Sequence, residues 1–266
     1  MTGGSGPPLE VVEIVNDQRV PAKKPRSNFT QRVISALVLA PPVLGAVWWG
    51  GVPFQMLVLA IAVLSGWEYF RLVRQGRHRP GHFAFMPFYI GLPFISMLWL
   101  RLESGPYGLA LFLFLMLSIW ATDIGAYAAG KSIGGPKLAP RISPKKTWAG
   151  LIGGMAASAC LGGLFGAAQS GDWLPGWLVP PAATDVPHDV SLAAIAAYAA
   201  IGAVLAVAGQ AGDLFESYMK RRVDVKDSST LIPGHGGILD RIDGLLFAAP
   251  LYALFEMTAG EWVRFW

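Results

Sequence analysis

Long apolar runs separated by short polar segments make up most of this chain. A helix needs about 20 apolar residues to cross the hydrocarbon core of a bilayer, and seven stretches approach that length. We expect Pro41-Pro42 to kink the first of them. The candidate spans run near 33–50, 52–70, 83–100, 105–123, 147–168, 190–210 and 244–259. The pattern predicts an all-α fold, a polytopic transmembrane helical bundle of about seven spans or more.

Composition supports the membrane interpretation. The chain is 53% hydrophobic and only 14% charged, whereas a soluble domain carries about 25% charged residues. Because the apolar residues form uninterrupted runs, a large soluble protein with an unusually apolar core is excluded. The single cysteine, Cys160, lies within such a run and has no neighbour that would make a disulfide or a metal site.

The basic residues lie between the apolar runs and follow the positive-inside rule. If the N-terminus is cytoplasmic, the inside segments are the N-terminal tail and the loops 71–82, 124–146 and 211–243. Together they hold every basic residue except Arg101 and Arg264. Membrane orientation therefore explains the net charge of +4, and no nucleic acid partner is expected. We predict an integral protein of a bacterial inner (plasma) membrane, with its active site facing the cytoplasm.

The chain divides into a tail and one large domain. Residues 1–31 are polar and rich in Pro and Gly, a composition typical of a disordered cytoplasmic tail rather than of a signal peptide. Residues 32–266 are predicted to form a single transmembrane catalytic domain. Its ionisable residues gather in two motif loops, 122–150 and 212–244.

The first motif loop combines an acidic residue with a basic cluster. Asp123 shares a helical face with Tyr127 and Gly130. Further on, Ser143 is predicted to cap a helix that has Pro144 at its first position. Lys145, Lys146 and Thr147 would then lie in the first turn and form an anion site. The alternative is an ordinary basic loop that only orients the protein.

The second motif loop is rich in carboxylates. One helical face carries Asp213, Glu216, Ser217 and Lys220, followed by Lys226-Asp227, a glycine turn around His235, and Asp240 and Asp243 at i, i+3. Such a density of carboxylates beside basic groups favours Mg²⁺-assisted phosphoryl or nucleotidyl transfer. The alternatives are juxtamembrane salt bridges for the carboxylates, and a backbone hydrogen bond rather than a phosphate contact for His235.

These two loops resemble those of the phosphatidate cytidylyltransferases, or CDP-diacylglycerol synthases. The matching residues are DIGAYAAG, SPKKTWAG, Ser217-x-x-Lys220-Arg221, Lys226-Asp227, Pro233-Gly234-His235-Gly236-Gly237 and Asp240-Arg241-x-Asp243. Gly244 departs from the family, which often has serine there; we expect this to be tolerated because it follows the acidic pair. The resemblance implies a helical membrane fold, a homodimer, and a Mg²⁺-dependent reaction of CTP with phosphatidate that gives CDP-diacylglycerol and pyrophosphate.

In such a reaction the lipid phosphate attacks the α-phosphorus of CTP in line, and roles follow for the residues of both loops. The residues expected to act in catalysis are Asp240, Asp243, Asp227, Lys226 and Ser217. Those expected to bind substrate are Lys145, Lys146, Thr147, Ser143, Lys220, Arg221, His235, Gly236, Gly237 and Arg241. Those expected to hold metal are Asp227, Asp240, Asp243, Asp213 and Asp123.

Two other functions fit the sequence less well. A CTP-dependent polyprenol kinase would transfer the γ-phosphate and release CDP, but the full run from His235 to Asp243 argues against it. A membrane transporter would place charges near the middle of its spans or show inverted repeats. Here the charges gather at the ends of the spans, and no repeat is visible.

Overall fold

The computed structural model describes residues 28–76, 80–103, 107–170, 175, 178 and 190–260. Residues 1–27 of the expected tail, most of the loop after the fifth span and the last six residues lie outside this range, whereas residues 28–31, predicted as tail, belong to the first helix. The elements in chain order are α1 (Asn28–Trp49), α2 (Gly51–Gln75), α3 (Pro80–Met86), η1 (Pro87–Gly91), α4 (Leu92–Leu98), η2 (Trp99–Glu103), α5 (Gly108–Ser132), β1 (Lys137–Ala139), β2 (Ser143–Thr147), α6 (Trp148–Ser170), α7 (Leu192–Arg221), α8 (Leu239–Phe255) and η4 (Glu256–Gly260).

Seven helices of the described chain are long and apolar enough to cross a membrane, as the sequence predicts. Five of these spans are the single helices α1, α2, α5, α6 and α7. The other two contain π-helical turns: one runs through α3, η1, α4 and η2, and the last joins α8 to η4. Many large apolar side chains on these helices are exposed, as expected of a surface that faces lipid rather than water.

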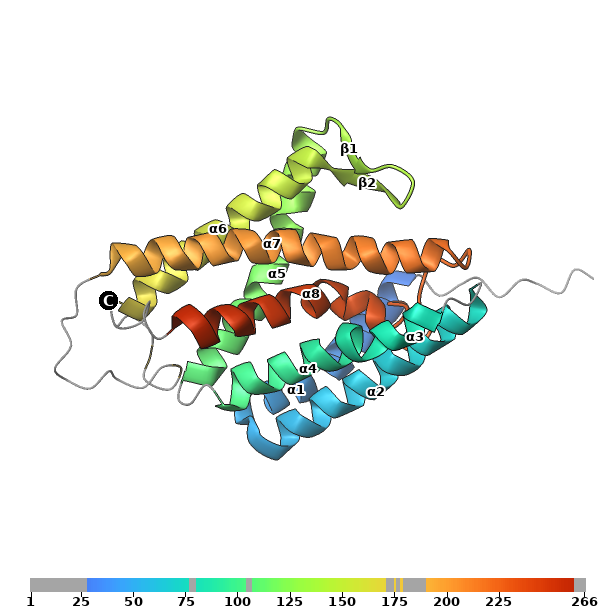
Figure 1. Cartoon of the computed structure of the whole chain (residues 1–266), viewed down its shortest axis with the longest axis horizontal. Coiled ribbons are helices and arrows are strands. Elements are labelled where there is room, and N and C mark those ends of the chain that lie inside the picture. Colours follow the sequence, from blue (N-terminus) through green and yellow to red (C-terminus); the bar gives the residue numbers. More distant parts are fainter. Residues whose placement is uncertain are drawn as a thin grey trace, which may run out of the picture.

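The helices form a bundle around α7 and α8. These two helices lie side by side along the long axis, with α4 against α8 and α6 against α7, while α5 and α6 run obliquely across them and meet at the β1–β2 hairpin (Figure 1). We call the end of the bundle that carries this hairpin and the segment 222–238 the loop end. The start of α1, the end of α2 and the start of α8 also lie there (Figure 1).

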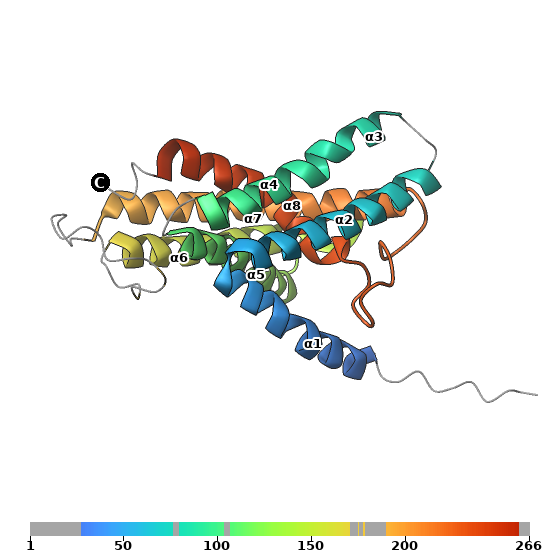
Figure 2. The same ribbon diagram turned by 90° about the horizontal axis from the view of Figure 1, so that it is seen from below.

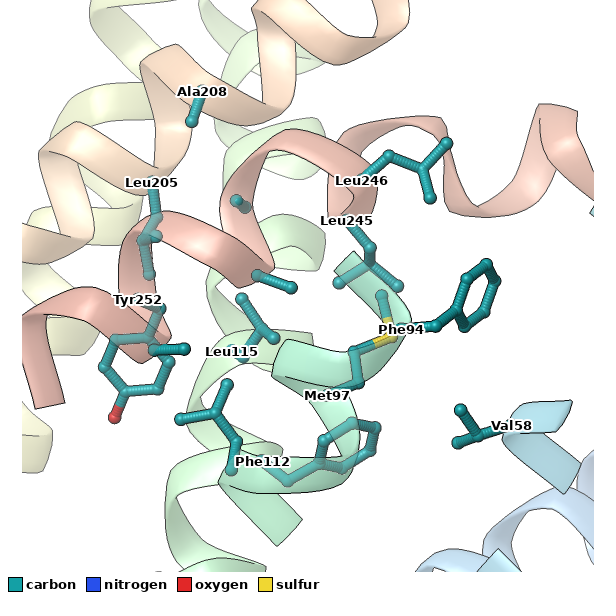
Figure 3. Close-up of a cluster of buried hydrophobic side chains, with 14 of the residues drawn as sticks. Val58, Phe94, Met97, Phe112, Leu115, Leu205, Ala208, Leu245, Leu246 and Tyr252 are labelled. Carbon is teal, nitrogen blue, oxygen red and sulfur yellow. The ribbon is translucent and has the colours of Figure 1, made fainter. Parts of the chain in front are cut away.

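The core of the bundle is apolar and lies between α2, α4, α5, α7 and α8. Leu205 and Ala208 of α7 face Leu245 and Tyr252 of α8, and Phe112 of α5 lies close to Met97 of α4 (Figure 3). Tyr252 and Leu205 are both fully buried. This packing fixes α8 relative to α5 and α7, and those three helices carry the candidate site residues Asp123, Asp213 and Asp243.

Helix α6 packs through a stripe of small residues spaced four apart. Its buried positions are Gly150, Gly154, Ser158, Gly162 and Gly166. A Cβ atom at Gly162 would lie 2.0 Å from the carbonyl oxygen of Tyr198 on α7. Only glycine allows this approach, and small residues are the usual means of bringing membrane helices close together.

Helix α1 stands apart from the rest. It is one continuous helix that contains Pro41 and Pro42, it is the least buried of the described spans, and it diverges from the bundle in Figure 2. At its C-terminal end, Arg101 donates hydrogen bonds to the carbonyl oxygens of Val47 (2.8 Å) and Trp48 (2.9 Å). Arg101 of η2 therefore caps the last turn of α1.

The predicted helix cap at Ser143 is wrong, although the fifth span starts within one residue of its predicted position. Ser143 does not cap a helix: Ser143–Thr147 is strand β2, paired antiparallel with β1, so the all-α prediction also misses a small hairpin. Gly134 and Gly135, both with positive φ, let the chain turn back before β1. Helix α6 begins at Trp148 instead, and Thr147 caps it by accepting a hydrogen bond from the amide of Gly150 at 3.0 Å.

Candidate active site

Two carboxylates come together where α7 and α8 touch. A Cβ atom at Gly212 would lie 2.3 Å from the carbonyl oxygen of Asp243, so the two backbones are in direct contact at this point. Asp213 follows Gly212, and Asp243 stands opposite on α8. The sequence places these residues 30 positions apart, and the close crossing of the two helices brings them together.

An acidic cavity of about 270 Å³ opens beside this crossing, between α5 and α8. One wall is apolar and the other is charged. Trp120, on the apolar wall, is 53% exposed on the outer surface of the bundle. The lining residues are Met116, Ile119, Trp120, Asp123, Asp240, Arg241, Asp243, Gly244 and Leu245. We call this space the acidic cavity.

A second cavity, of about 350 Å³, lies between α5, α6, α7 and the β1–β2 hairpin. Its wall is rich in lysine, and we call it the basic cavity. Asp123 lines both cavities, so they meet at this residue. The residues that line the basic cavity are Asp123, Ala126, Tyr127, Gly130, Lys131, Lys145, Lys146, Thr147, Gly150, Leu151, Gln210 and Asp213.

The hairpin places its lysines against α7. Lys146 pairs with Asp213 at 2.6 Å and lies 3.5 Å from the carbonyl oxygen of Gln210. Ser217, one turn beyond Asp213, donates to its carboxylate at 3.2 Å. The structure thus brings the predicted residues Lys145, Lys146 and Thr147 to one cavity, but it presents them on strand β2 rather than at a helix N-terminus.

Asp240 lies in a network of internal contacts. Its carboxylate receives hydrogen bonds from Lys220 at 2.6 Å, from the amide of Ser228 at 3.0 Å and from the amide of Gly237 at 2.8 Å. Lys220 also pairs with Glu216, which is buried on the same helix. The predicted site residues Asp240 and Lys220 thus form an ion pair that links α7 to α8. This agrees with the salt-bridge alternative for this pair.

The glycine turn is closed on itself and on α1. The amide of Gly236 donates to the carbonyl oxygen of Ile232 at 3.1 Å, and the carbonyl oxygen of His235 accepts from Arg241 at 2.6 Å. The imidazole of His235 lies 2.8 Å from the hydroxyl of Ser35 on α1. Arg32 of α1 adds a 2.8 Å hydrogen bond to the carbonyl oxygen of Gly234. These contacts bring the first and last spans together.

The remaining predicted residues line neither the acidic nor the basic cavity. Asp227 and Asp240 flank Gly236, since a Cβ atom there would lie 3.6 Å from the Asp227 carboxyl carbon and 3.1 Å from an Asp240 oxygen. Lys226 is exposed beside Asp227. Arg221 is exposed and donates to the carbonyl oxygen of Val225 at 3.3 Å. Ser143 lies in β2 and does not line either cavity.

The acidic residues fit a magnesium ion only with help from a ligand. In the part of the chain that the structure describes, no three Asp, Glu, His or Cys side chains converge closely enough to hold a metal by themselves. Mg²⁺ is usually bound by one or two carboxylates, waters and substrate phosphates. Asp123 and Asp243 of the acidic cavity and Asp213 of the basic cavity supply such carboxylates.

Sequence reasoning misses several residues of the site. Glu68 of α2 is completely buried beneath the segment 228–239. The sequence feature that could have identified it is a single carboxylate within an apolar run. Lys131 lines the basic cavity and donates to the hydroxyl of Tyr127 at 3.3 Å. Met116 and Trp120 line the acidic cavity, but they look like any other span residues in the sequence and give no signal.

Comparison with known proteins identifies the family of this chain. The profile of the Cytidylyltransferase family matches residues 30–90 and 76–258. The phosphatidate cytidylyltransferase of Brucella suis is 36% identical over 280 aligned positions, which cover 88% of this chain and 96% of that protein. The enzymes of the same name from Rickettsia bellii and Bacillus subtilis are 34% and 39% identical over 86% and 66% of this chain, and over 90% and 58% of their own lengths. The chain therefore belongs to the cytidylyltransferase family.

Proposed function

We propose that this chain is a phosphatidate cytidylyltransferase, which transfers the cytidylyl group of CTP to phosphatidate and releases pyrophosphate. The observation that carries the proposal is the meeting of two unlike cavities at Asp123. One cavity is half apolar and half acidic, and the other is lined with lysines. A reaction that joins a lipid phosphate to a soluble triphosphate needs two such spaces side by side.

The acidic cavity suits the lipid substrate. Met116, Ile119 and Trp120 give it an apolar wall, and Trp120 is exposed where the bundle faces lipid. Arg241 provides a guanidinium group at the same cavity, and guanidinium binds phosphate well. We infer that the acyl chains stay in the bilayer while the headgroup phosphate enters between α5 and α8.

The basic cavity suits the nucleotide. Lys131, Lys145 and Lys146 surround it, and the hydroxyl of Tyr127 lies on its wall. Three ammonium groups match the charge of a triphosphate, which in water repels an incoming phosphate nucleophile. Lys146 is paired with Asp213 in the structure, so we infer that it divides its contacts between this carboxylate and the phosphates.

The chemistry asks for positioning and charge neutralisation. One oxygen of the lipid phosphate forms a bond to the α-phosphorus of CTP, and the bond from that phosphorus to the bridging oxygen of pyrophosphate breaks. The nucleophile is already anionic, so no strong general base is needed. Of the carboxylates Asp123, Asp213 and Asp243, one or two would hold Mg²⁺ together with phosphate oxygens and water, and the bound ion would supply positive charge that offsets the charge of the phosphates. The lysines hold the triphosphate in line with the attacking oxygen.

We also propose that the loop end faces the cytoplasm of a bacterial inner membrane. Every described Lys and Arg except Arg101 lies at this end, which is the distribution that the positive-inside rule requires. CTP is then delivered directly to the basic cavity, and the phosphate of the lipid lies at the same depth. We propose in addition that the chain forms a homodimer, as the family resemblance implies.

A turnover assay tests the reaction. Purified chain in detergent micelles receives labelled CTP, phosphatidate and Mg²⁺, and both products are measured. We expect CDP-diacylglycerol and pyrophosphate in equal amounts. Release of CDP with phosphorylation of a lipid alcohol would instead identify a kinase.

Two matched variants connect the reaction to the site. Asp243→Asn removes a carboxylate from the acidic cavity and is expected to lower kcat by about 100-fold or more. Asp224→Asn is the control, because Asp224 is exposed in the nearby loop and asparagine tolerates its positive φ equally well. Equal activity of the two variants would place the reaction elsewhere.

A further inference from the structure

Glu68 is an acidic side chain of α2 that is shielded from solvent on all sides. Its exposed fraction is 0%, and it lines neither the acidic nor the basic cavity. A buried carboxylate is costly unless hydrogen bonds compensate for the lost water. Glu68 has such bonds, and all those that the structure shows lead to one segment of the chain.

That segment is 228–239, which carries the glycine turn into α8. The hydroxyls of Ser228 (3.1 Å) and Ser229 donate to Glu68. The amides of Ile238 (3.1 Å) and Leu239 (2.7 Å), at the start of α8, donate to the same carboxylate. Four donors from the two ends of the segment therefore converge on one side chain, which closes the segment into a loop fixed to α2.

The same segment also donates hydrogen bonds to Asp240, the residue that follows it. The hydroxyl of Ser228 lies 3.1 Å from Glu68 and 3.0 Å from Asp240, so the two carboxylates share it. The amides of Ser228 and Gly237 donate to the same Asp240 oxygen at 3.0 and 2.8 Å. Three of the donors that orient Asp240 thus belong to the loop that Glu68 fixes. Lys220 holds the other oxygen.

The space around Glu68 is also tightly filled. A Cβ atom at Gly237 would lie 1.9 Å from the hydroxyl of Ser228 and 2.7 Å from a Glu68 oxygen. The backbone of the glycine turn therefore rests directly on this carboxylate. We expect a substitution at Glu68 to shift the backbone of Gly237, and the shift of Gly237 to change the orientation of Asp240.

We propose that Glu68 is a positioning residue for the reaction: it fixes segment 228–239 and so sets the orientation of Asp240 at the acidic cavity. The assignment rests on the proposed function for its catalytic consequence, but the fixing of the segment stands independently of it. Glu68 touches no substrate, since Ser228, Ser229 and the start of α8 surround its carboxylate.

The chemistry of the four donors requires an ionised carboxylate. Both carboxylate oxygens accept, and together they offer about four acceptor positions. Glutamine replaces one oxygen with an amide that donates, which would face donors already in place. Aspartate keeps the charge but is one methylene shorter. Glu68→Gln and Glu68→Asp therefore separate loss of charge from loss of reach.

Hydrogen exchange of the full-length chain in detergent micelles tests the fixing of the segment without any substrate. In Glu68→Gln, we expect the amides of 228–239 to exchange about 10-fold faster, a change that corresponds to the loss of one hydrogen bond to a charged group. Glu256→Gln is the matched control. Glu256 is also buried in a span, where the hydroxyl of Tyr198 donates to it at 3.1 Å near the opposite end of the bundle. Unchanged exchange of 228–239 in Glu68→Gln overturns the proposal, whatever the activity.

Kinetics then test the consequence for Asp240. We expect Glu68→Gln to lower kcat about 10- to 100-fold, as loss of a supporting contact around a metal or phosphate site typically does, with KM for CTP near that of the wild type. Glu68→Asp should recover part of this loss. Wild-type kcat per folded protein in Glu68→Gln, or an equal loss in Glu256→Gln, contradicts the positioning role.

A milder variant covers the case in which Glu68→Gln does not fold. Ser228→Ala removes only the shared hydroxyl and leaves the amide contacts to Asp240 in place. It should lower kcat in the same direction by a smaller factor, and no change would overturn the proposed link from Glu68 to Asp240. A wild type that makes no CDP-lipid would refute the proposed function alone, because the exchange experiment does not depend on turnover.

Discussion

Individual residues at this site act through pairs that the sequence does not reveal. Lys146 and Asp213 lie far apart in the chain and form a 2.6 Å ion pair. The sequence identifies both as candidate site residues, but it does not show that they contact each other. The same holds for Lys220 and Asp240, which the sequence treats as separate phosphate and metal ligands and which the structure joins.

The contribution of one hairpin lysine can be measured against its neighbour. We expect Lys146→Ala to lower kcat/KM for CTP by about 10- to 100-fold, because it removes a charged contact to phosphate in the basic cavity. Lys137→Ala is the control, since Lys137 lies in β1 of the same hairpin and does not line either cavity. Steady-state kinetics with varied CTP distinguish the two, and equal effects would mean that only overall hairpin charge matters.

Arg101 makes a different prediction, on stability rather than activity. Its guanidinium caps the carbonyl oxygens of Val47 and Trp48 at the end of α1. Arg101→Ala should therefore destabilise the protein by about 1–3 kcal/mol, the cost of leaving such groups without a partner. Thermal unfolding in detergent measures this loss, and kcat per folded protein should stay at the wild-type value. An unchanged melting temperature would show that the cap contributes nothing.

At the scale of elements, the apolar runs predict the spans well because hydrophobicity and length alone decide which segments can cross a bilayer. Each of the seven predicted ranges overlaps an observed span. The β1–β2 hairpin escapes prediction because the pairing of Lys137–Ala139 with Ser143–Thr147 depends on a tight turn at 140–142, where the amide of Ile142 donates to the carbonyl oxygen of Ala139 at 3.1 Å. A Ser-Pro pair before an apolar run looks the same whether a helix or a strand follows.

Helix α6 gives an element-scale test with adjacent residues. Gly162→Ala would place a Cβ atom 2.0 Å from the Tyr198 carbonyl, whereas at Gly163 the nearest atom would be 3.6 Å away. We expect Gly162→Ala to cost about 1–3 kcal/mol through overpacking and Gly163→Ala to be tolerated. Melting temperatures of the two variants in one detergent decide this, and equal values would refute the close packing of α6 on α7.

At the scale of the whole molecule, the two motif loops are close to each other because α6 and α7, the two spans that separate them in the chain, lead away from the loop end and return to it. The sequence identifies nearly all the ionisable residues of the site, since these residues are rare in an apolar chain. It does not identify which cavity each residue faces. Asp123 and Asp213 line the basic cavity, while Asp240 shares the acidic cavity with Asp243; that division follows from how α5, α7 and α8 cross.

The orientation of the whole molecule is testable by proteolysis. Arg221, Arg222 and Lys226 are exposed at the loop end. If this end faces the cytoplasm, trypsin should cut there in inverted membrane vesicles and leave the site intact in spheroplasts. Fragment masses identify the cut, and lysis of the spheroplasts should restore it. Cleavage in intact spheroplasts would reverse the proposed topology.

The burial of Glu68 also has a consequence for how the protein is made. Its first hydrogen-bonding partner, Ser228, lies 160 residues further along the chain. At a synthesis rate of about 5–20 residues per second, α2 must wait roughly 10–30 s with a carboxylate that nothing yet neutralises. Glu68 lies about 10 Å from the end of α2 at Gln75, close enough to the membrane surface for water to reach it during that time. Segment 228–239 then takes the place of that water once it has been synthesised.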